Sequence, residues 1–504
     1  MNTSESNTEI HAPVLLERMP TGVPGLDTIL GGGLIRGAIY LVMGRPGTGK
    51  TTFGNQICFT HVRRGARAAY VTLLAESHAS MVKNLQTLSF FDAAMMNREL
   101  VYVGAYKALR DDKLRGLLGL LRQVIDDERA SLIVLDGIAP ARALAGSDLA
   151  LKEFIVELQV LGAMTNCTTV ILANMSADDA NGPEHTMVDG LFELGFERVK
   201  RRTLRTLEVL KFRGSKHLLG RQELLITSDG LLVYPRVEDL LSVQARPPAA
   251  SSRRVSTGLR ELDTLLGGGL LSGTTTVLLG FCGSGKTTLG MHFLDEGGSR
   301  DENGLYFGFY EAPQRLLAAA DQLGFRLREH EQSGKFSQIW QGAHEYGLDA
   351  LAARLLEAVE RRKVQRLVID GIEALRQAAS EPDRIIRYLT ALTNELRARD
   401  VTTLITDETA QARGPEIELR IDGTSALAEN LILLEYVSLG TELRRLLSVV
   451  KQRSSSYQPE LREFVLNSRG IELASDRDSA ETILRGSSEL WSRRNRRSRA
   501  PGTE

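Results

Sequence analysis

The sequence predicts an α/β protein of two tandem domains, each with a mostly parallel β-sheet flanked by helices and followed by C-terminal β-hairpins. Three observations predict this fold. A glycine-rich loop pattern occurs twice, a longer motif recurs before each loop at the same offset, and short apolar stretches alternate with helical patterns in both halves. The chain of 504 residues is long enough for two domains of roughly 200–250 residues, each with its own core.

The two loops fit the pattern G-x-x-x-x-G-K-[ST], which binds nucleotide phosphates. Its glycines let backbone N–H groups approach the phosphates. We expect Lys50 and Lys286 to neutralise the β- and γ-phosphates, and Thr51 and Thr287 to ligate Mg²⁺. The pattern also occurs by chance, but two copies in matching context argue against an accidental match. The candidate phosphate-binding residues are Gly44, Gly47, Thr48, Gly49, Lys50, Thr51 and Thr52 in the first loop, and Gly280, Gly283, Ser284, Gly285, Lys286, Thr287 and Thr288 in the second.

The repeat extends over each whole half of the chain. Residues 21–33 recur as residues 257–269, and both copies end in three glycines. Strands are expected at 38–43, 68–74, 132–136 and 168–172, and again at 275–279, 305–310, 367–370 and 402–405. Helical patterns at 114–125 and 351–359 fall between them, and strand-rich stretches follow at 204–235 and 443–473. Strands that alternate with helices indicate a parallel sheet covered on both faces.

Composition along the chain predicts the domain boundaries, and the net charge bears on the kinds of partner. We expect a disordered segment at 1–12, a first domain at 13–240, a linker rich in proline and small residues at 241–254, a second domain at 255–486 and an arginine-rich polar tail at 487–504. The tail is expected to be solvated, with an anionic partner as the alternative. The net charge of −1 gives no general drive toward nucleic acid or membrane.

The cysteine content and the apolar stretches of the sequence indicate in which cellular compartment the protein resides. No apolar run approaches the ~18 residues that span a bilayer, and the polar N-terminus is no signal peptide. The three cysteines are scattered, which favours neither a zinc ribbon nor a disulfide framework. We therefore expect a cytoplasmic protein.

Two aspartates close buried apolar stretches. Asp136 follows Leu132–Leu135, and Asp370 follows Leu367–Ile369. Such an aspartate can simply end a strand. Downstream of a phosphate loop, it is better explained as the carboxylate that holds the Mg²⁺ water shell.

Glu76 and Glu311 stand just after the second strand of their halves. A carboxylate there can orient the water that attacks the γ-phosphate, so both are candidate catalytic residues together with the two loop lysines. The alternative is a surface glutamate. Both halves keep a glutamate while its neighbours differ, which favours the catalytic role.

A Lys-x-Arg pair lies late in each half, as Lys211 with Arg213 and Lys451 with Arg453. Residues i and i+2 of a strand share a face, so each pair presents two cations side by side. A solvated strand face would explain this pattern too. The sharper hypothesis is a cationic clamp for the γ-phosphate, supplied by a neighbouring subunit of a ring or filament.

These motifs together resemble the KaiC family, whose members are tandem RecA-like ATPases, over nearly the whole chain. The first half resembles the family's K-x-R-G-x-x-H segment from Lys211 to His217, so His217 is expected at the nucleotide. The resemblance implies a two-tiered hexameric ring with ATP between subunits, and slow ATP hydrolysis. It also implies autokinase activity, as in clock members, and a small KaiB-like or other signalling partner protein.

The chain departs from clock members of the family at three places. The paired glutamates match Ala75-Glu76 and Tyr310-Glu311, so one glutamate remains in each half. The serine–threonine phosphorylation pair matches Ser425 and Ala426, which leaves Ser425 as the candidate phosphoacceptor. Tyr457 stands in the second half where the first has His217. These changes suit a relative outside the core clock oscillator.

The sequence thus favours a Mg²⁺-dependent ATPase of KaiC type with two ATP sites per chain, with autokinase activity at Ser425 as a further expectation. One alternative is a DNA-processing ATPase of RecA or RadA type, opposed by the neutral charge and the lack of a four-cysteine zinc module. Another is a scaffold in which nucleotide binding only assembles the ring, opposed by the intact lysines, aspartates and glutamates.

Overall fold

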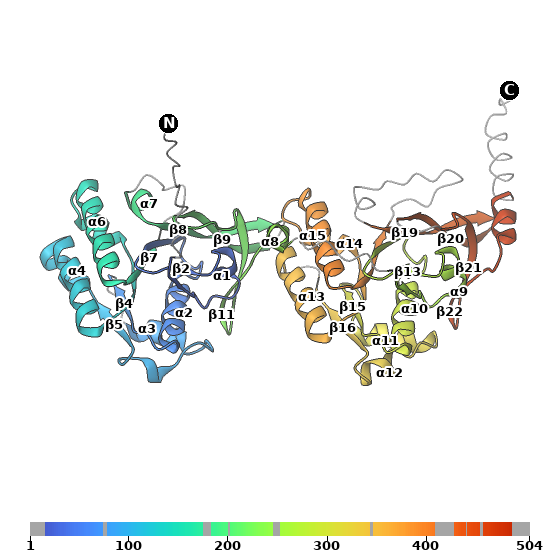
Figure 1. The fold of residues 1–504 in the computed structure, drawn as a ribbon, viewed down its shortest axis with the longest axis horizontal. Coiled ribbons are helices and arrows are strands. Elements are labelled where there is room, and N and C mark those ends of the chain that lie inside the picture. The colour runs from blue at the N-terminus through green and yellow to red at the C-terminus, as the bar shows by residue number, and fades with distance from the viewer. Residues whose placement is uncertain are drawn as a thin grey trace, which may run out of the picture. The chain divides into compact units, whose positions relative to one another are not determined.

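The chain folds into two compact units, Met1–Arg236 and Val237–Glu504 (Figure 1). The computed structural model describes residues 16–73, 78–174, 183–199, 202–244, 252–342, 346–408, 428–439, 441–453 and 457–485. The predicted segments 1–12 and 487–504, and residues 245–251 of the predicted linker, lie outside the described residues.

The first unit contains a nine-stranded sheet in the order β11-β10-β9-β8-β3-β7-β6-β4-β5. Strands β3 to β8 pair in parallel, and β8 to β11 pair in antiparallel hairpins. Its strands are β1 (Arg18–Met19), β2 (Leu34–Ile35), β3 (Ile39–Gly44), β4 (Ala68–Thr72), β5 (Leu100–Gly104), β6 (Leu132–Asp136), β7 (Thr168–Ala173), β8 (Gly190–Val199), β9 (Arg202–Phe212), β10 (Arg221–Thr227) and β11 (Gly230–Tyr234). Its helices are α1 (Leu26–Ile29), α2 (Lys50–Arg63), α3 (His78–Leu85), the 3₁₀ helix η1 (Ala93–Met95), α4 (Tyr106–Glu128), α5 (Ala139–Leu144), α6 (Asp148–Thr165) and α7 (Pro183–Met187).

The second unit repeats this topology in the order β16-β15-β17-β18-β14-β19-β20-β21-β22. Its strands are β12 (Arg254–Val255), β13 (Leu270–Leu271), β14 (Thr275–Gly280), β15 (Gly304–Gly308), β16 (Phe336–Trp340), β17 (Arg366–Asp370), β18 (Thr402–Glu408), β19 (Asn430–Leu439), β20 (Glu442–Gln452), β21 (Leu461–Asn467) and β22 (Gly470–Leu473). Its helices are α8 (Val237–Gln244), α9 (Arg260–Leu265), α10 (Lys286–Ser299), α11 (Pro313–Gln322), α12 (Leu327–Gln332), α13 (Leu348–Arg362), α14 (Ile372–Ala378) and α15 (Arg384–Ala398). The predicted fold of two α/β domains with C-terminal hairpins is confirmed.

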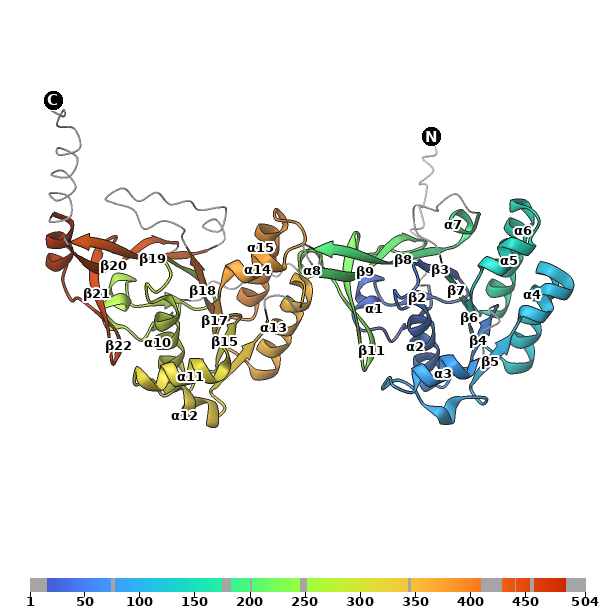
Figure 2. The same ribbon diagram turned by 180° about the vertical axis from the view of Figure 1, so that it is seen from behind.

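Helices cover both faces of each sheet (Figure 2). In the first unit, α2 contributes Phe53 and Ile57 to a core on one face, while α4 and α6 contribute Leu117 and Phe154 to a core on the other. In the second unit, α10 and the pair α13 and α15 divide the faces in the same way. Because both faces are buried, the central strands are apolar for most of their length, as in β3 and β6.

Helix α8 belongs to the second unit, although we predicted that residues up to 240 would belong to the first domain. Val237 is buried in the core beneath α13 and α15. Glu238 accepts two hydrogen bonds from Arg384, at 2.7 and 2.8 Å, and Arg384 also donates to Asp349 at 2.6 Å. The division therefore falls after Arg236.

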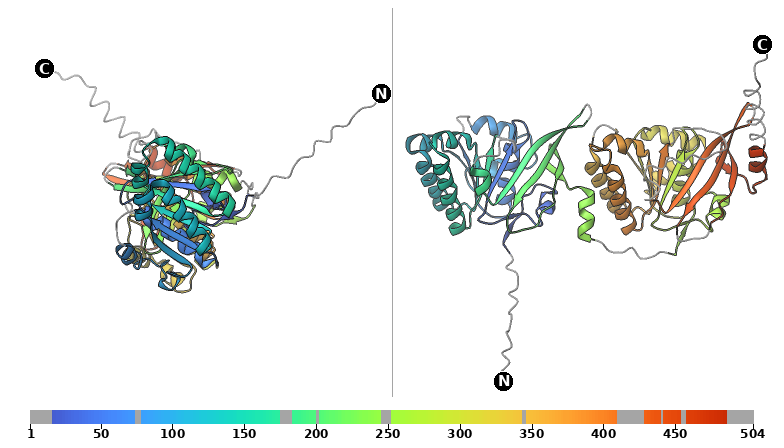
Figure 3. Two further views of the ribbon diagram at one scale, coloured as in Figure 1. Left: turned by 90° about the vertical axis from the view of Figure 1, so that its left-hand side faces the viewer. Right: turned by 90° about the horizontal axis from the view of Figure 1, so that it is seen from above.

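The right-hand view of Figure 3 shows α8 following the last strand of the first unit along the chain. None of the described helices is long and apolar enough to cross a membrane.

Candidate nucleotide sites

Each phosphate loop joins the central strand of its sheet to a helix. The loops run from β3 to α2 and from β14 to α10, and the helices begin after Gly49 and Gly285. These glycines have φ angles of 106° and 105°, in the left-handed region that favours glycine. The amides at the helix N-termini are thereby aimed at the loop, where a phosphate would bind.

The loop lysines lie folded over their loops. Lys50 Nζ donates to the carbonyl oxygens of Gly44 and Arg45 at 2.7 and 2.9 Å. Lys286 Nζ donates to those of Gly280 and Phe281 at 2.8 and 2.9 Å. Burial lowers the pKa of both lysines; Asp136 opposes this shift for Lys50, and Glu408 and then Asp370 oppose it for Lys286. Both ammonium groups are thus positioned to donate to a phosphate oxygen.

The other loop residues shape the turn. Thr48 Oγ1 donates to the Arg45 carbonyl at 2.9 Å, and Ser284 is fully buried at the matching place. A Cβ on Gly44 or Gly280 would lie 2.3 or 2.5 Å from a carbonyl oxygen of the neighbouring strand. Thr52 and Thr288 follow in the first helical turn and are half-buried.

In the second site, the Asp370 carboxylate accepts hydrogen bonds from three hydroxyl groups. Thr287 Oγ1 and Tyr306 OH donate to its Oδ2 at 2.9 and 2.5 Å, and Thr406 Oγ1 donates to its Oδ1 at 2.6 Å. In the first site, Tyr70 OH donates to Asp136 Oδ2 at 2.6 Å.

A threonine hydroxyl beside a carboxylate fits Mg²⁺, which prefers oxygen ligands and retains several waters. The described residues contain no cluster of three or more His, Cys, Asp or Glu side chains that could hold a metal ion. A metal here would therefore depend on Thr51 or Thr287, on Asp136 or Asp370, and on phosphate oxygens. The metal-binding role of these residues stays a prediction.

The sequence did not indicate a role for the two tyrosines that contact these aspartates. Tyr70 and Tyr306 are buried, and burial followed by the neighbouring aspartate raises the pKa of each phenol well above its usual value. Both phenols therefore act as hydrogen-bond donors to the candidate metal-binding carboxylates. The one available signal was a tyrosine on the second strand of both halves.

The structure describes only one of the two glutamates that are predicted to orient the attacking water. Glu311 is exposed and follows β15, whose last residue Gly308 pairs with Asp370. It therefore lies at the same edge of the sheet as the phosphate loop. Glu76 and the candidate phosphoacceptor Ser425 lie outside the described residues.

The Lys-x-Arg pairs lie at the opposite edge of the sheet from the loops of their own units. Lys211 pairs with Leu191, which lies level with Leu41 in the middle of β3, and the Arg213 N–H donates to Asp189, level with the start of β3. Gly44, at the end of β3 where the loop begins, pairs with Leu194. Lys451 and Gly280 are separated in the same way along β19. Strands rise about 3.3 Å per residue, and β9 and β20 lie two strands away from β3 and β14, so each pair is set apart from the loop of its own unit.

A β-bulge precedes the lysine in each copy, where the register shifts between Leu191 and Phe192 and between Leu431 and Ile432. Such bulges re-aim the side chains that follow. Lys211 Nζ donates to the Thr186 carbonyl at 2.7 Å, and Arg213 lies 3.8 Å from Asp189.

Lys451 Nζ donates to the Ala428 carbonyl at 2.9 Å, and Arg453 is exposed. His217 packs edge-on against Phe212, with ring centroids 6.3 Å apart. Tyr457 donates to the Val450 carbonyl at 3.1 Å. Lys451, His217 and Tyr457 thus each contact residues of their own unit, and a role of these residues at a nucleotide stays a prediction.

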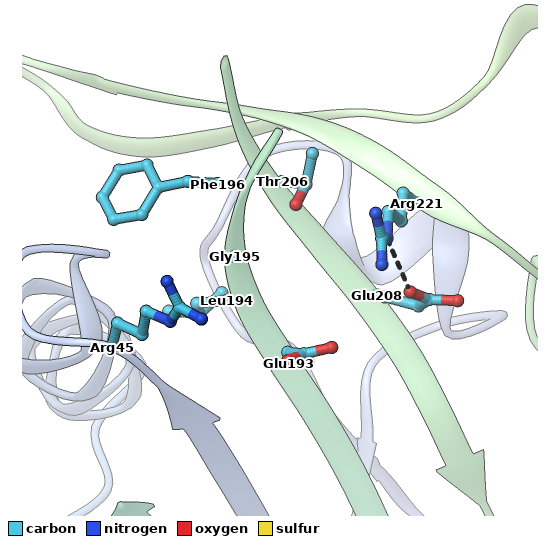
Figure 4. Close-up of a pocket in the computed structure, with 8 residues that line it drawn as sticks. All are labelled: Arg45, Glu193, Leu194, Gly195, Phe196, Thr206, Glu208 and Arg221. Atoms are coloured by element: carbon cyan, nitrogen blue, oxygen red, sulfur yellow. Dashed lines mark hydrogen bonds and ion pairs between the residues drawn. The ribbon is translucent and has the colours of Figure 1, made fainter. Parts of the chain in front are cut away.

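A pocket of about 180 Å³ adjoins the first loop (Figure 4). It is lined by Arg45, Glu193, Leu194, Gly195, Phe196, Thr206, Glu208 and Arg221. Glu208 and Glu193 are directly opposed across strands β8 and β9, and Arg221 lies 3.2 Å from Glu208. The lining sets two carboxylates against two guanidinium groups, so it carries no net positive charge to attract a triphosphate.

Comparison with known proteins decides the family. A family model described as KaiC ATPase matches residues 19–238 and again residues 255–478. The chain belongs to the KaiC family. Two relatives are named circadian clock oscillator protein KaiC, from Parathermosynechococcus lividus and Synechococcus elongatus. They are 26% and 25% identical to this chain, and each match covers 96% of this chain and 92% and 94% of the relative. A circadian clock protein KaiC3 from Synechocystis sp. is 24% identical over 94% of both chains.

The KaiC family model spans both repeats, so both units are KaiC ATPase domains. The expected resemblance is thereby confirmed. Each KaiC domain carries its own phosphate-loop pattern and strand-terminal aspartate, so the duplication covers the predicted nucleotide-binding residues as well as the fold.

Proposed function

We propose that this KaiC-family protein is a Mg²⁺-dependent ATP hydrolase with two nucleotide sites per chain. The observation that carries the proposal is the second-site contact of Thr287 with Asp370 at 2.9 Å, beside a lysine folded over a phosphate loop. The first site presents Lys50, Thr51 and Asp136 on the same elements.

Each group has a stated task in this proposal. Loop amides and the lysine bind the β- and γ-phosphates, and the threonine and aspartate hold Mg²⁺ and its waters. When bound, the ion neutralises charge that develops on the phosphates. Glu76 and Glu311 orient the attacking water in their respective sites.

The protein would act as a homo-oligomer, for which a hexameric ring is our proposal. Because the Lys-x-Arg pairs lie at the sheet edge opposite their own loops, Lys211 with Arg213, and Lys451 with Arg453, would reach the nucleotide of an adjacent subunit. Such a contact is heterologous, and in this proposal its rotation closes into a ring rather than an open filament. A cytoplasmic location and a small KaiB-like or signalling protein partner complete the proposal.

Autokinase activity at Ser425 is the finer part of the proposal. It rests on the family resemblance, since Ser425 matches one member of the phosphoacceptor pair. Mass spectrometry after incubation with ATP would detect phosphoserine at this position. A chain that hydrolyses ATP without phosphoserine at Ser425 would be an ATPase only.

Phosphate release from the purified chain tests the hydrolase. Lys50→Ala and Lys286→Ala should each silence one site, and the double variant should lose turnover. Turnover of the double variant equal to that of the unmodified chain would end the proposal. The RecA or RadA alternative predicts hydrolysis stimulated by single-stranded DNA, with binding that weakens as salt rises. If the ring assembles with a non-hydrolysable ATP analogue and the chain shows no ATP turnover, the result would favour the alternative of a scaffold in which nucleotide binding only assembles the ring.

A further inference from the structure

The two nucleotide sites differ at the end of one strand. Strand β18 lies between β14 and β17, as β7 lies between β3 and β6. Thr406 pairs with Asp370, and Leu172 pairs with Asp136. The second unit therefore has Thr406, Asp407 and Glu408 where the first has Leu172, Ala173 and Asn174.

All three residues at the end of β18 contact a residue of the second site or a residue that holds the strand end in place. Thr406 donates to Asp370 at 2.6 Å. Arg376, on α14, donates to both carboxylate oxygens of Asp407 at 2.9 and 3.0 Å. The backbone N–H of Glu408 donates to Asp407 Oδ1 at 3.0 Å. The bidentate contact holds the strand end, and with it the position from which Glu408 extends.

The side chain of Glu408 reaches the phosphate-loop lysine. Its Oε1 lies 3.8 Å from Lys286 Nζ, and the lysine side chain is 7% exposed while the glutamate side chain is 60% exposed. The carbonyl oxygens of Gly280 and Phe281 hold the ammonium at 2.8 and 2.9 Å. The ammonium therefore stays beside the carboxylate, whereas the first site has an uncharged asparagine, Asn174, at the same place in the strand.

We propose that Glu408 competes with the terminal phosphate of ATP for Lys286, and so gives the second site a weaker affinity for ATP than the site would otherwise have. This inference rests on the proposed function, because it assumes that both loops bind ATP. The Glu408 carboxylate pairs with the Lys286 ammonium, which would otherwise pair with the γ-phosphate. The negative charge of Glu408 also repels the γ-phosphate directly. ADP lacks the γ-phosphate, so Glu408 lowers the preference of the second site for ATP over ADP.

The test is equilibrium binding of fluorescent ATP and ADP analogues to the full-length chain. Lys50→Ala removes binding at the first site, so the signal comes from the second site. In this background Glu408→Gln should tighten ATP binding about five-fold, a modest effect because the carboxylate is largely exposed. ADP binding should change less, and the ATP effect should shrink in 1 M salt, where the Debye length is about 3 Å.

Matched variants guard against an indirect effect. Glu408→Asn, which introduces the residue of the first site, should act like Glu408→Gln. In a Lys286→Ala background, Asn174→Glu should weaken ATP binding at the first site by a similar factor. Unchanged or weaker ATP binding by both Glu408 variants would overturn the inference. Nucleotide binding by the double lysine variant would instead overturn the proposed function, whatever Glu408 does.

Discussion

The Thr287 hydroxyl donates a hydrogen bond to Asp370 Oδ2 at 2.9 Å, although the two residues are 83 positions apart. Thr287 lies in the first turn of α10, and Asp370 closes β17. Strands β14 and β17 are parallel members of one sheet, so the helix that follows β14 begins at the edge where β17 ends. Ligands of open parallel sheets bind at this edge.

Asp370→Asn should reduce Mg²⁺-dependent hydrolysis at the second site about 10- to 100-fold, the usual effect of disturbing a metal site. The amide keeps the size of the side chain but removes the negative charge that holds the ion. The measurement is a Mg²⁺ titration of phosphate release in a Lys50→Ala background. Asp136→Asn with Lys286→Ala is the matched control for the first site. An unaltered Mg²⁺ requirement would show that Asp370 does not hold the ion.

Tyr306→Phe should lower the free energy of unfolding of the second unit by about 1–2 kcal/mol, the cost of removing one donor from a buried acceptor. Asp370 keeps the hydroxyls of Thr287 and Thr406, so the loss should stay moderate. Denaturant unfolding followed by tryptophan fluorescence reports this unit, because Trp340 lies on its strand β16 and residues 1–236 contain no tryptophan. Tyr310→Phe, at a 60% exposed position, should have little effect. Equal losses for the two variants would contradict a specific role of Tyr306.

The elements of the fold could be predicted because their signals are local in sequence. The loop pattern and the apolar stretch that ends in Asp370 each lie within a few residues, and the helical pattern at 351–359 lies within α13. The contacts of Asp370 with Tyr306 and Thr406 could not be predicted, because they depend on β17 lying between β15 and β18.

The same reason explains other features that the sequence did not indicate. The bulges before Lys211 and Lys451 exist only in the pairing of two strands. The placement of α8 with the second unit depends on Arg384, which is 146 residues from Glu238. Long-range contacts of this kind leave no local pattern to detect.

Acid should destabilise the second unit through His292. Burial lowers the pKa of this imidazole from 6.5 to about 4, and its Nε2 accepts a hydrogen bond from the Ile471 N–H at 2.9 Å. The folded state thus favours the neutral ring. Its contribution is fully present above pH 6.5 and is lost as the pH falls toward 4, by roughly 3 kcal/mol in all.

Tryptophan-detected unfolding between about pH 7 and pH 4 measures this contribution. His292→Gln does not titrate, and its amide oxygen can accept from Ile471, so the variant should show a shallower decline in stability over that range. Parallel pH profiles of the variant and the unmodified chain would rule out a contribution from His292.

Mixed oligomers should recover hydrolysis that neither variant shows alone. One variant lacks both loop lysines, through Lys50→Ala and Lys286→Ala, and the other lacks the cationic pairs, through alanine at Lys211, Arg213, Lys451 and Arg453. Because these pairs lie at the sheet edge opposite the loops of their own units, each intact loop in a mixed ring can meet an intact pair on a neighbour. Phosphate release from the mixture, after dissociation and reassembly, should exceed the sum of the separate variants. If mixed rings form, as native mass spectrometry can verify, and turnover still does not rise, then the pairs do not act across subunits.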